Sequence, residues 1–219
     1  GLNPDETKIA ENLKTAGYAT GIYGKWHLGD QPRFLPTRQG FDTFFGIPYS
    51  DDMTPGPGPK ANFPELPLMR DETVIEAPVD RDHLVRRCTE EVIAFIERHA
   101  ARPFFVYLPH TMPGSTAHPF SSPAFRGRSR NGAYGDAVEE LDFHSGRLLD
   151  ALDELGLRDN TLVIFTNDNG GERLSDNGPF RHSKASLWEG GLRVPALLRW
   201  PGRLPKGRVS GQVAMSMDL

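Results

Sequence analysis

The sequence has 219 residues, 37% of them hydrophobic and 25% charged, which suits a folded domain with a substantial core. Its formal net charge of −4 gives no electrostatic reason to expect nucleic acid or an anionic membrane as a partner. No stretch approaches the ~20 consecutive apolar residues of a membrane-spanning helix, and the opening GLNPDETKIAEN has no features of a signal peptide. The single cysteine, Cys88, excludes an internal disulfide framework and a cysteine-rich zinc site.

Hydrophobic periodicity predicts helices and strands that alternate along the chain, with glycine and proline gathered between them. Helices are predicted over residues 5–16, 81–101 and 134–155, and strands over residues 19–23, 41–47, 104–108, 161–166 and 194–200. The largely apolar runs at 104–108 and 161–166 predict buried strands, whereas the proline-rich residues 48–80 predict a long surface excursion. This order predicts an α/β fold with a mixed, mainly parallel sheet between helices.

Two of the predicted helices carry an apolar face. The helix over residues 81–101 places Leu84, Cys88 and Phe95 on one side, so Cys88 is predicted to be a buried packing residue. The helix over residues 134–155 has a stripe that includes Val138 and Leu155, and we expect this stripe to face the core.

Polar residues follow three of the predicted strands, where open α/β sheets bind their ligands. Lys25 and His27 lie in a glycine-flanked loop, His110 comes directly after FFVYLP, and Asp168-Asn169 follows TLVIFT. Taken singly, the histidine is more often structural, and Asp-Asn-Gly is also an ordinary turn sequence. Taken together, oxygen ligands for Ca²⁺ or Mg²⁺, lysines and histidines at strand ends predict a pocket for a tetrahedral dianion.

A phosphate-binding P-loop is the competing interpretation of the loop that contains Lys25. The pattern GxxxxGK[ST] would need glycine at position 19 and serine or threonine at position 26. This sequence has Ala19 and Trp26 there, so the P-loop is excluded.

The segments around these residues resemble the sulfatase family. GYATGIYGKWHLG (17–29) is similar to a sulfatase signature with a Gly-Lys-x-His core. The resemblance continues, in order and spacing, through GFDTFFGIPYS (40–50), PFFVYLPHTMP (103–113), YGDAVEELD (134–142), DNTLVIFTNDNG (159–170) and WEGGLRVPALLRWPG (188–202). Arylsulfatase A and N-acetylgalactosamine-6-sulfatase are the nearest members of the family in this respect.

The resemblance implies an alkaline-phosphatase-like fold and hydrolysis of sulfate esters. Residues 1–219 would be a partial sulfatase catalytic domain, with the nucleophile segment before Gly1 and a C-terminal subdomain both missing. The implied nucleophile is a formylglycine made from Cys or Ser in a C/S-x-P-x-R motif, which these residues do not contain. The implied metal is Ca²⁺, with Mg²⁺ as the alternative, and Asp168 and Asn169 match the later pair of its ligands.

Five further positions match family residues that act on the sulfate group. Lys25 matches the lysine that bridges nucleophile and sulfate, and His27 matches the histidine that hydrogen-bonds the formylglycine hydrate. His110 matches the histidine near the leaving oxygen, a candidate proton donor. Ser50 and Lys184 match residues that bind the sulfate.

The sequence departs from the family pattern around Lys184. The family usually has glycine before this lysine and threonines after it, whereas this chain has Ser183 before it and Ala185-Ser186 after it. Cys88 does not restore the missing nucleophile motif, because its context RRCTEEV has no proline or arginine at the required places.

Two other functions stay open at this stage. A phosphodiesterase or phosphonate hydrolase of the same superfamily would use a similar oxyanion site, and a non-catalytic sulfatase-like fragment would only bind sulfated sugars. Residues 1–219 alone are expected to be inactive as a hydrolase. The implied partner is a sulfated small molecule or sulfated sugar, and the implied location is exported: periplasmic, extracellular or lysosomal. The sequence does not fix the oligomeric state.

Overall fold

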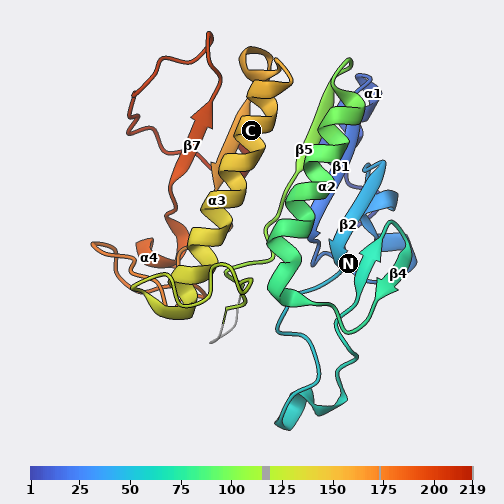
Figure 1. Ribbon diagram of the computed structural model, residues 1–219, viewed down its shortest axis with the longest axis vertical. Helices are drawn as coiled ribbons and strands as arrows, with labels where there is room; N and C mark the ends of the chain where they lie inside the picture. The colour runs from blue at the N-terminus through green and yellow to red at the C-terminus, as the bar shows by residue number, and fades with distance from the viewer. Residues whose placement is uncertain (115–118, 173, 219) are drawn as a thin grey trace. The chain divides into compact units, whose positions relative to one another are not determined.

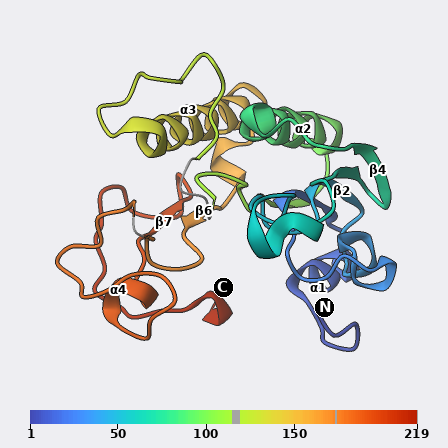
Figure 2. The same cartoon turned by 90° about the horizontal axis from the view of Figure 1, so that it is seen from below.

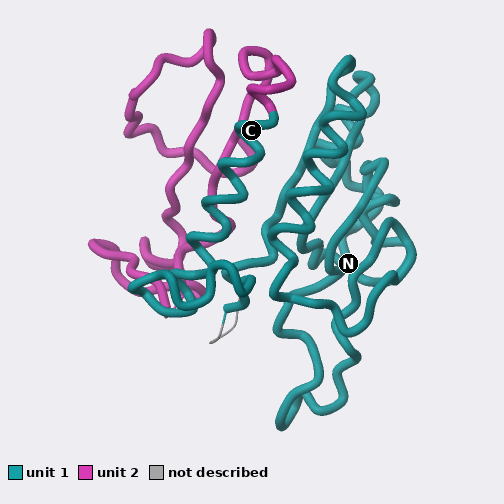
Figure 3. The backbone as a smooth tube through the Cα atoms, in the orientation of Figure 1, with its two compact units in different colours: residues 1–151 teal, residues 152–219 magenta. Residues whose placement is uncertain are grey.

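The computed structural model describes residues 1–114, 119–172 and 174–218. The chain divides into two compact units, residues 1–151 and residues 152–219 (Figure 3), and each is described by itself. Within the described residues, none of the helices combines the length and the apolar character needed to cross a membrane.

The first unit is built on a five-stranded sheet with the order β4-β3-β2-β1-β5 (Figure 1). Strands β1 (Ala19–Lys25), β2 (Thr43–Ile47) and β5 (Phe104–Tyr107) run parallel. Strands β3 (Leu68–Arg70) and β4 (Thr73–Glu76) extend the sheet in antiparallel pairing. The predicted α/β fold with a mixed sheet is therefore confirmed, and its parallel pairing lies in β2, β1 and β5.

Two predictions for this sheet are wrong in detail. Residues 48–80 are not only a surface excursion, because they contain β3 and β4, and Leu68 within β3 is fully buried. Strand β5 is an edge strand in this structure, and its Tyr107 is 48% exposed where a buried strand was predicted.

Helices cover both faces of this sheet (Figure 2). Helix α1 (Ile9–Thr15) lies on one face, and Gly17 follows its C-cap residue Ala16 with a φ of 87°, which suits the glycine stop predicted from the sequence. Helix α2 (Leu84–His99) lies on the other face and contacts β1 and β2. Its buried side carries Leu84 and Phe95, so the predicted amphipathic helix is confirmed.

Cys88 is buried on this side of α2, as predicted. Burial raises the pKa of its thiol to about 12, so the reactive thiolate is scarce at physiological pH. We expect Cys88 in the native protein to resist a disulfide reagent at mildly alkaline pH and to react once guanidinium chloride unfolds the chain. Peptide mass spectrometry after labelling locates the modified residue, and stoichiometric labelling of Cys88 in the native state would contradict the expectation.

Helix α3 (Gly132–Glu154) agrees only in part with the apolar stripe predicted from the sequence: Leu152 of the stripe is buried, and Leu141 and Leu148 are half-buried. Val138 and Leu155 of the predicted stripe are exposed, whereas Ala137, Glu140 and His144 are buried. The buried side is therefore partly polar, and its two ionisable residues lie one helical turn apart.

The second unit has little secondary structure. Strands β6 (Val163–Thr166) and β7 (Ala196–Arg199) form a two-stranded antiparallel sheet, and α4 (Glu189–Leu192) is a single turn. The run 161–166 was predicted to be a buried strand, but Ile164 and Phe165 are exposed. The prediction is wrong for this structure because the unit has too few elements to cover both faces of its sheet.

Candidate active site

Four predicted site residues, Lys25, His27, Ser50 and His110, lie at one edge of the parallel strands. Lys25 ends β1, Ser50 follows β2, and His110 follows β5, so all three lie beyond carboxyl ends. The backbone N–H of Lys25 donates to the carbonyl of Pro109 at 2.8 Å. The N–H of His27 donates to the carbonyl of Pro48 at 3.0 Å, which ties the three loops together.

Two glycines allow the three strands to approach each other at this edge. A Cβ on Gly24 would overlap the carbonyl oxygen of Pro109, and a Cβ on Gly46 would overlap the carbonyl oxygen of Gly24. Gly24 also has a φ of 134°, which side-chain-bearing residues rarely adopt. These glycines therefore set the positions of the loops that carry Lys25 and His110.

His27 occupies a backbone conformation that is uncommon for a non-glycine residue. Its φ is 56°, in the left-handed region, where histidine is one of the better tolerated side chains. This turn takes the chain away from β1 directly after Trp26, which is buried and donates its indole N–H to the carbonyl of Phe34 at 2.9 Å. The exposed His27 side chain lines a cavity of about 390 Å³ together with residues at the start of the chain.

His110 is largely withdrawn from solvent. Burial, with a smaller repulsion from His144 of α3, lowers the pKa of His110 to about 4. Its imidazole is therefore neutral at physiological pH, with one N–H donor and one acceptor nitrogen. In this state His110 can hydrogen-bond an oxygen without adding a positive charge.

Two buried polar side chains beside this edge, those of Asp51 and Thr111, were not singled out from the sequence. Ser50 and Asp51 are both buried, and a guanidinium nitrogen of Arg81 donates to the Asp51 carbonyl at 3.0 Å. Thr111 is buried next to His110. The available signal was that Asp51 directly follows Ser50 and Thr111 directly follows His110. The burial of these loop residues cannot be predicted from a local sequence pattern.

The second unit holds Asp168, Asn169 and Lys184. The backbone N–H of Lys184 donates to the carbonyl of Gly171 at 3.0 Å, and the N–H of Gly170 donates to the carbonyl of Gly191 at 2.9 Å. These bonds bring the Asp-Asn turn and the lysine loop together within the unit. As with Gly24, a Cβ on Gly170 would overlap a neighbouring carbonyl oxygen.

Asp168 and Asn169 fit a hard divalent cation as part of its ligand set. The Asn169 amide nitrogen donates to the carbonyl of Gly170 at 2.8 Å, which leaves its amide oxygen as the candidate ligand. Carboxylate and amide oxygens suit Ca²⁺ and Mg²⁺, and both ions need about six or more ligands. Within residues 1–114, 119–172 and 174–218, no group of three or more His, Cys, Asp or Glu residues is placed to hold a metal ion.

Comparison with known proteins identifies the family. The sulfatase family model matches residues 1–219. The chain belongs to the sulfatase family. It is 39% identical to N-acetylgalactosamine-6-sulfatase of Canis lupus familiaris over 236 residues, covering 100% of this chain and 44% of the relative. It is 37% identical to steryl-sulfatase of Mus musculus over 296 residues, covering 100% of this chain and 47% of the relative.

A solved sulfatase shares the fold of this sulfatase chain. The crystal structure of the PsFucS1 sulfatase from Pseudoalteromonas sp. matches with a TM-score of 0.78 and 28% identity, covering 92% of this chain and 46% of that one. The fold is alkaline-phosphatase-like, as the resemblance implied. The sulfatase chain spans about half the length of the relatives that it matches.

The loop around Lys184, where the sequence departs from the family pattern, has an irregular backbone. His182 and Ala185 both have positive φ values, 64° and 69°, so the loop bends sharply on either side of the lysine. The His182 ring stacks on Trp188, with centroids 5.5 Å apart. Ala185 thus adopts left-handed backbone, which glycine would adopt at lower cost.

Proposed function

We propose that the complete protein is a sulfuric ester hydrolase of the arylsulfatase type. The observation that supports this most directly is the edge of parallel strands where Lys25, Ser50 and His110 gather, in a chain whose relatives are sulfatases. Asp168, Asn169 and Lys184 are proposed to act in the same reaction.

Lys25 and Lys184 are proposed to bind the sulfate group. A sulfate ester carries a negative charge that becomes more widely spread as the ester bond breaks, and fixed ammonium groups stabilise such charge. Ser50 would donate a hydrogen bond to a sulfate oxygen. Asp168 and Asn169 would hold Ca²⁺ or Mg²⁺ with ligands from outside residues 1–219, and the ion would supply positive charge next to the sulfate.

His27 and His110 are proposed to handle protons. Formylglycine, expected outside residues 1–219, would supply a hydroxyl nucleophile as its hydrated aldehyde, and His27 would hydrogen-bond that hydrate. His110 would donate an N–H hydrogen bond to the leaving alkoxide oxygen. Binding of an anionic ester next to His110 would raise its pKa from about 4 and favour transfer of a full proton.

The substrate is proposed to be a sulfated sugar or another sulfated small molecule. N-acetylgalactosamine-6-sulfatase and steryl-sulfatase match at 39% and 37% identity, and their names differ in substrate. Identity of this degree therefore supports the sulfate-ester chemistry more strongly than it supports any one alcohol. We also propose an exported location, on the resemblance to lysosomal-type sulfatases alone.

The test is a comparison of matched aryl esters with the complete protein. We expect kcat/KM for an aryl sulfate to exceed that for the corresponding aryl phosphate by about a hundredfold or more, because Lys25, His27 and Lys184 match the sulfatase pattern, which favours sulfate as the group transferred. The two esters share one leaving group, so the ratio of their kcat/KM values reports only the preference for sulfate or phosphate as the group transferred. A preference for the phosphate would indicate the phosphodiesterase or phosphonate hydrolase alternative, and no turnover of either would favour a non-catalytic protein.

A further inference from the structure

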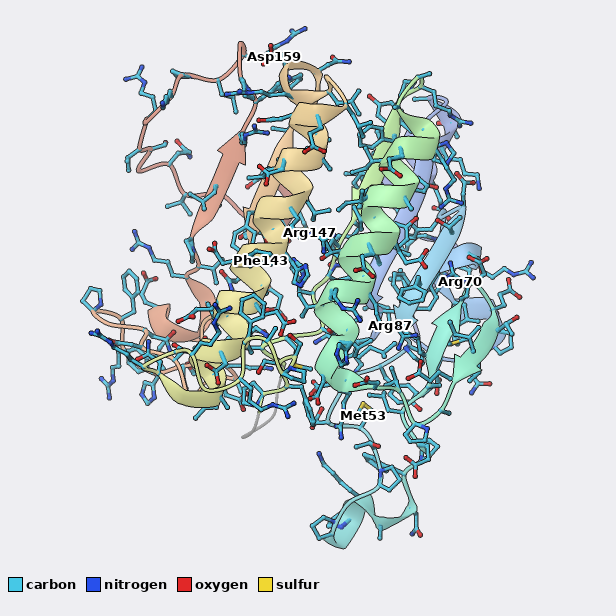
Figure 4. All side chains as sticks on the ribbon, viewed as in Figure 1. Met53, Arg70, Arg87, Phe143, Arg147 and Asp159 are labelled. Carbon is cyan, nitrogen blue, oxygen red and sulfur yellow. The ribbon has the colours of Figure 1, made fainter. Side chains whose placement is uncertain are left out.

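A cavity of about 520 Å³ lies in the first unit between α2, α3 and the loop before α3. None of the proposed catalytic residues lines it. Figure 4 shows two of its residues, Phe143 and Arg147, on successive turns of α3, with Arg147 on the side toward α2. Its other lining residues include Arg86, Arg128, Glu140 and His144.

A buried carboxylate lines this cavity. The Glu140 side chain is almost fully enclosed, with the residue 1% exposed. One oxygen, Oε2, accepts a hydrogen bond from the backbone N–H of Ser122 at 2.7 Å. The other, Oε1, is buried and has no hydrogen-bond partner among the described residues. An unmet buried carboxylate oxygen is costly, so this position favours a ligand with a hydrogen-bond donor.

His144 provides a complementary group close to this oxygen. Burial, with a smaller effect of the Arg147 guanidinium, lowers the pKa of His144 and so favours the neutral ring. A guanidinium nitrogen of Arg147 lies 3.3 Å from Nδ1 and can only donate, which leaves the ring hydrogen on Nε2. Nε2 lies 3.8 Å from Glu140 Oε1, too far for a direct hydrogen bond. A hydroxyl group suits this pair, because it accepts from the imidazole N–H and donates to the carboxylate.

The rim of the cavity is positively charged. Arg86 and Arg147 both lie near the carboxylate of Glu90, at 3.4 Å and 4.0 Å. Arg128 stacks over the ring of Phe125, with its guanidinium carbon 5.3 Å from the centroid. Arg86 and Arg147 thus share one carboxylate, and Arg128 lies over an aromatic ring, which leaves positive charge and planar donors on the rim for a sulfate or carboxylate group.

One wall of the cavity is aromatic. The rings of Phe125 and Phe143 lie 5.5 Å apart, and Phe143 is 54% exposed. An exposed ring beside hydrogen-bonding groups offers a flat apolar surface to the C–H face of a sugar.

We propose that this cavity binds a sulfated sugar unit, with a hydroxyl on Glu140, a sulfate on the arginine rim and the sugar ring against Phe143. The proposal rests on the proposed function, since the bound unit would belong to the sulfated saccharide on which the enzyme acts. The cavity would then hold a part of the substrate that is not hydrolysed.

Binding of a chondroitin 6-sulfate hexasaccharide tests this proposal. Calorimetry would use the complete protein with Lys25→Ala, which is expected to slow turnover by about a hundredfold or more and to weaken binding at the proposed catalytic residues. In that background the pair Arg128→Ala and Arg147→Ala is expected to weaken binding about tenfold or more. Glu140→Gln, which keeps the side-chain size, is expected to weaken it by a smaller factor. The matched control is Arg98→Ala, an arginine of α2 that does not line the cavity.

The outcomes separate this proposal from the proposed function. The proposal would be overturned if the arginine-pair variant, the Glu140→Gln variant and the Arg98→Ala control all bound the sulfated hexasaccharide with equal affinity. It would also be overturned if an unsulfated chondroitin hexasaccharide bound as tightly as the sulfated one. With Lys25 intact, the arginine pair is expected to hydrolyse a small aryl sulfate at the unmodified rate. If the unmodified protein hydrolyses no sulfate ester, the proposed function fails, and the binding comparison still decides whether the cavity takes a sulfated sugar.

Discussion

Replacement of Lys25 or His110 by alanine is expected to lower kcat/KM of the complete protein for an aryl sulfate by about a hundredfold or more. Lys25 ends a buried central strand, and its backbone N–H is fixed to the carbonyl of Pro109, the residue before His110. The two side chains therefore begin from neighbouring points on a rigid edge. Removing either one takes away an interaction with charge that develops as the ester bond breaks, so kcat should fall more than KM rises.

The two variants should differ in their dependence on the leaving group. His110 is proposed to act on the leaving oxygen, so His110→Ala should be most damaging for esters of poorly acidic alcohols. Lys25→Ala should reduce turnover of all esters by a similar factor, because it acts on the sulfate. Controls are Lys206→Ala and His83→Ala, which remove a lysine and a histidine outside the proposed site, with circular dichroism to confirm folding. Near-normal turnover in both Lys25→Ala and His110→Ala would remove these residues from the site.

The edge that carries Lys25 and His110 could be predicted from the sequence because the elements there have local signals, whereas Ser50 was assigned only through the resemblance to sulfatases. The three strands are short apolar runs, and a polar residue follows each run at the carboxyl end. Parallel pairing then places these ends together without any long-range information beyond the α/β order. The sequence shows that glycines flank Lys25 and His27. The role of Gly24 and Gly46 in close packing could not be predicted, because it depends on the pairing of three strands.

Strands β3 and β4 were missed because they are defined by pairing and not by pattern. Each has only three or four residues, inside a proline-rich segment. Phe45 of β2 pairs with Arg70 of β3, so the hairpin forms on an existing sheet edge. The turn between the two strands has Asp71 at a φ of 54°. Aspartate tolerates this conformation, but its presence in a sequence does not predict it.

The burial of β6 was mispredicted, and that of α3 was mispredicted in part, for a different reason. An apolar run predicts burial only if another layer covers it, and the second unit lacks such a layer, so Phe165 is exposed. In α3 the core side includes Glu140 and His144, whose polar identity hid the face from a hydrophobic pattern. The same two residues line the cavity proposed to bind a sulfated sugar. The polar residues that hid the buried face of α3 from the hydrophobic pattern are therefore the ones proposed to contact a ligand.

Gly24→Ala is expected to destabilise the protein by about 3 kcal/mol or more. The added methyl group would occupy the position of the Pro109 carbonyl oxygen, and the backbone would keep a φ of 134° that alanine disfavours. Neither the strand nor the carbonyl can move freely, because the N–H of Lys25 is bonded to that same carbonyl at 2.8 Å. Urea unfolding measures the change in free energy.

Gly146→Ala is the matched control, because Gly146 lies within α3 and a Cβ there would meet no atom within 4 Å. It is expected to change the free energy of unfolding by at most ~1 kcal/mol, in the stabilising direction, since alanine is the better helix former. If Gly24→Ala were as stable as Gly146→Ala, the close contact between β1 and the loop after β5 would not exist as described. If it folded but lost activity, the small shift of Lys25 relative to His110 would itself be enough to disable the proposed site.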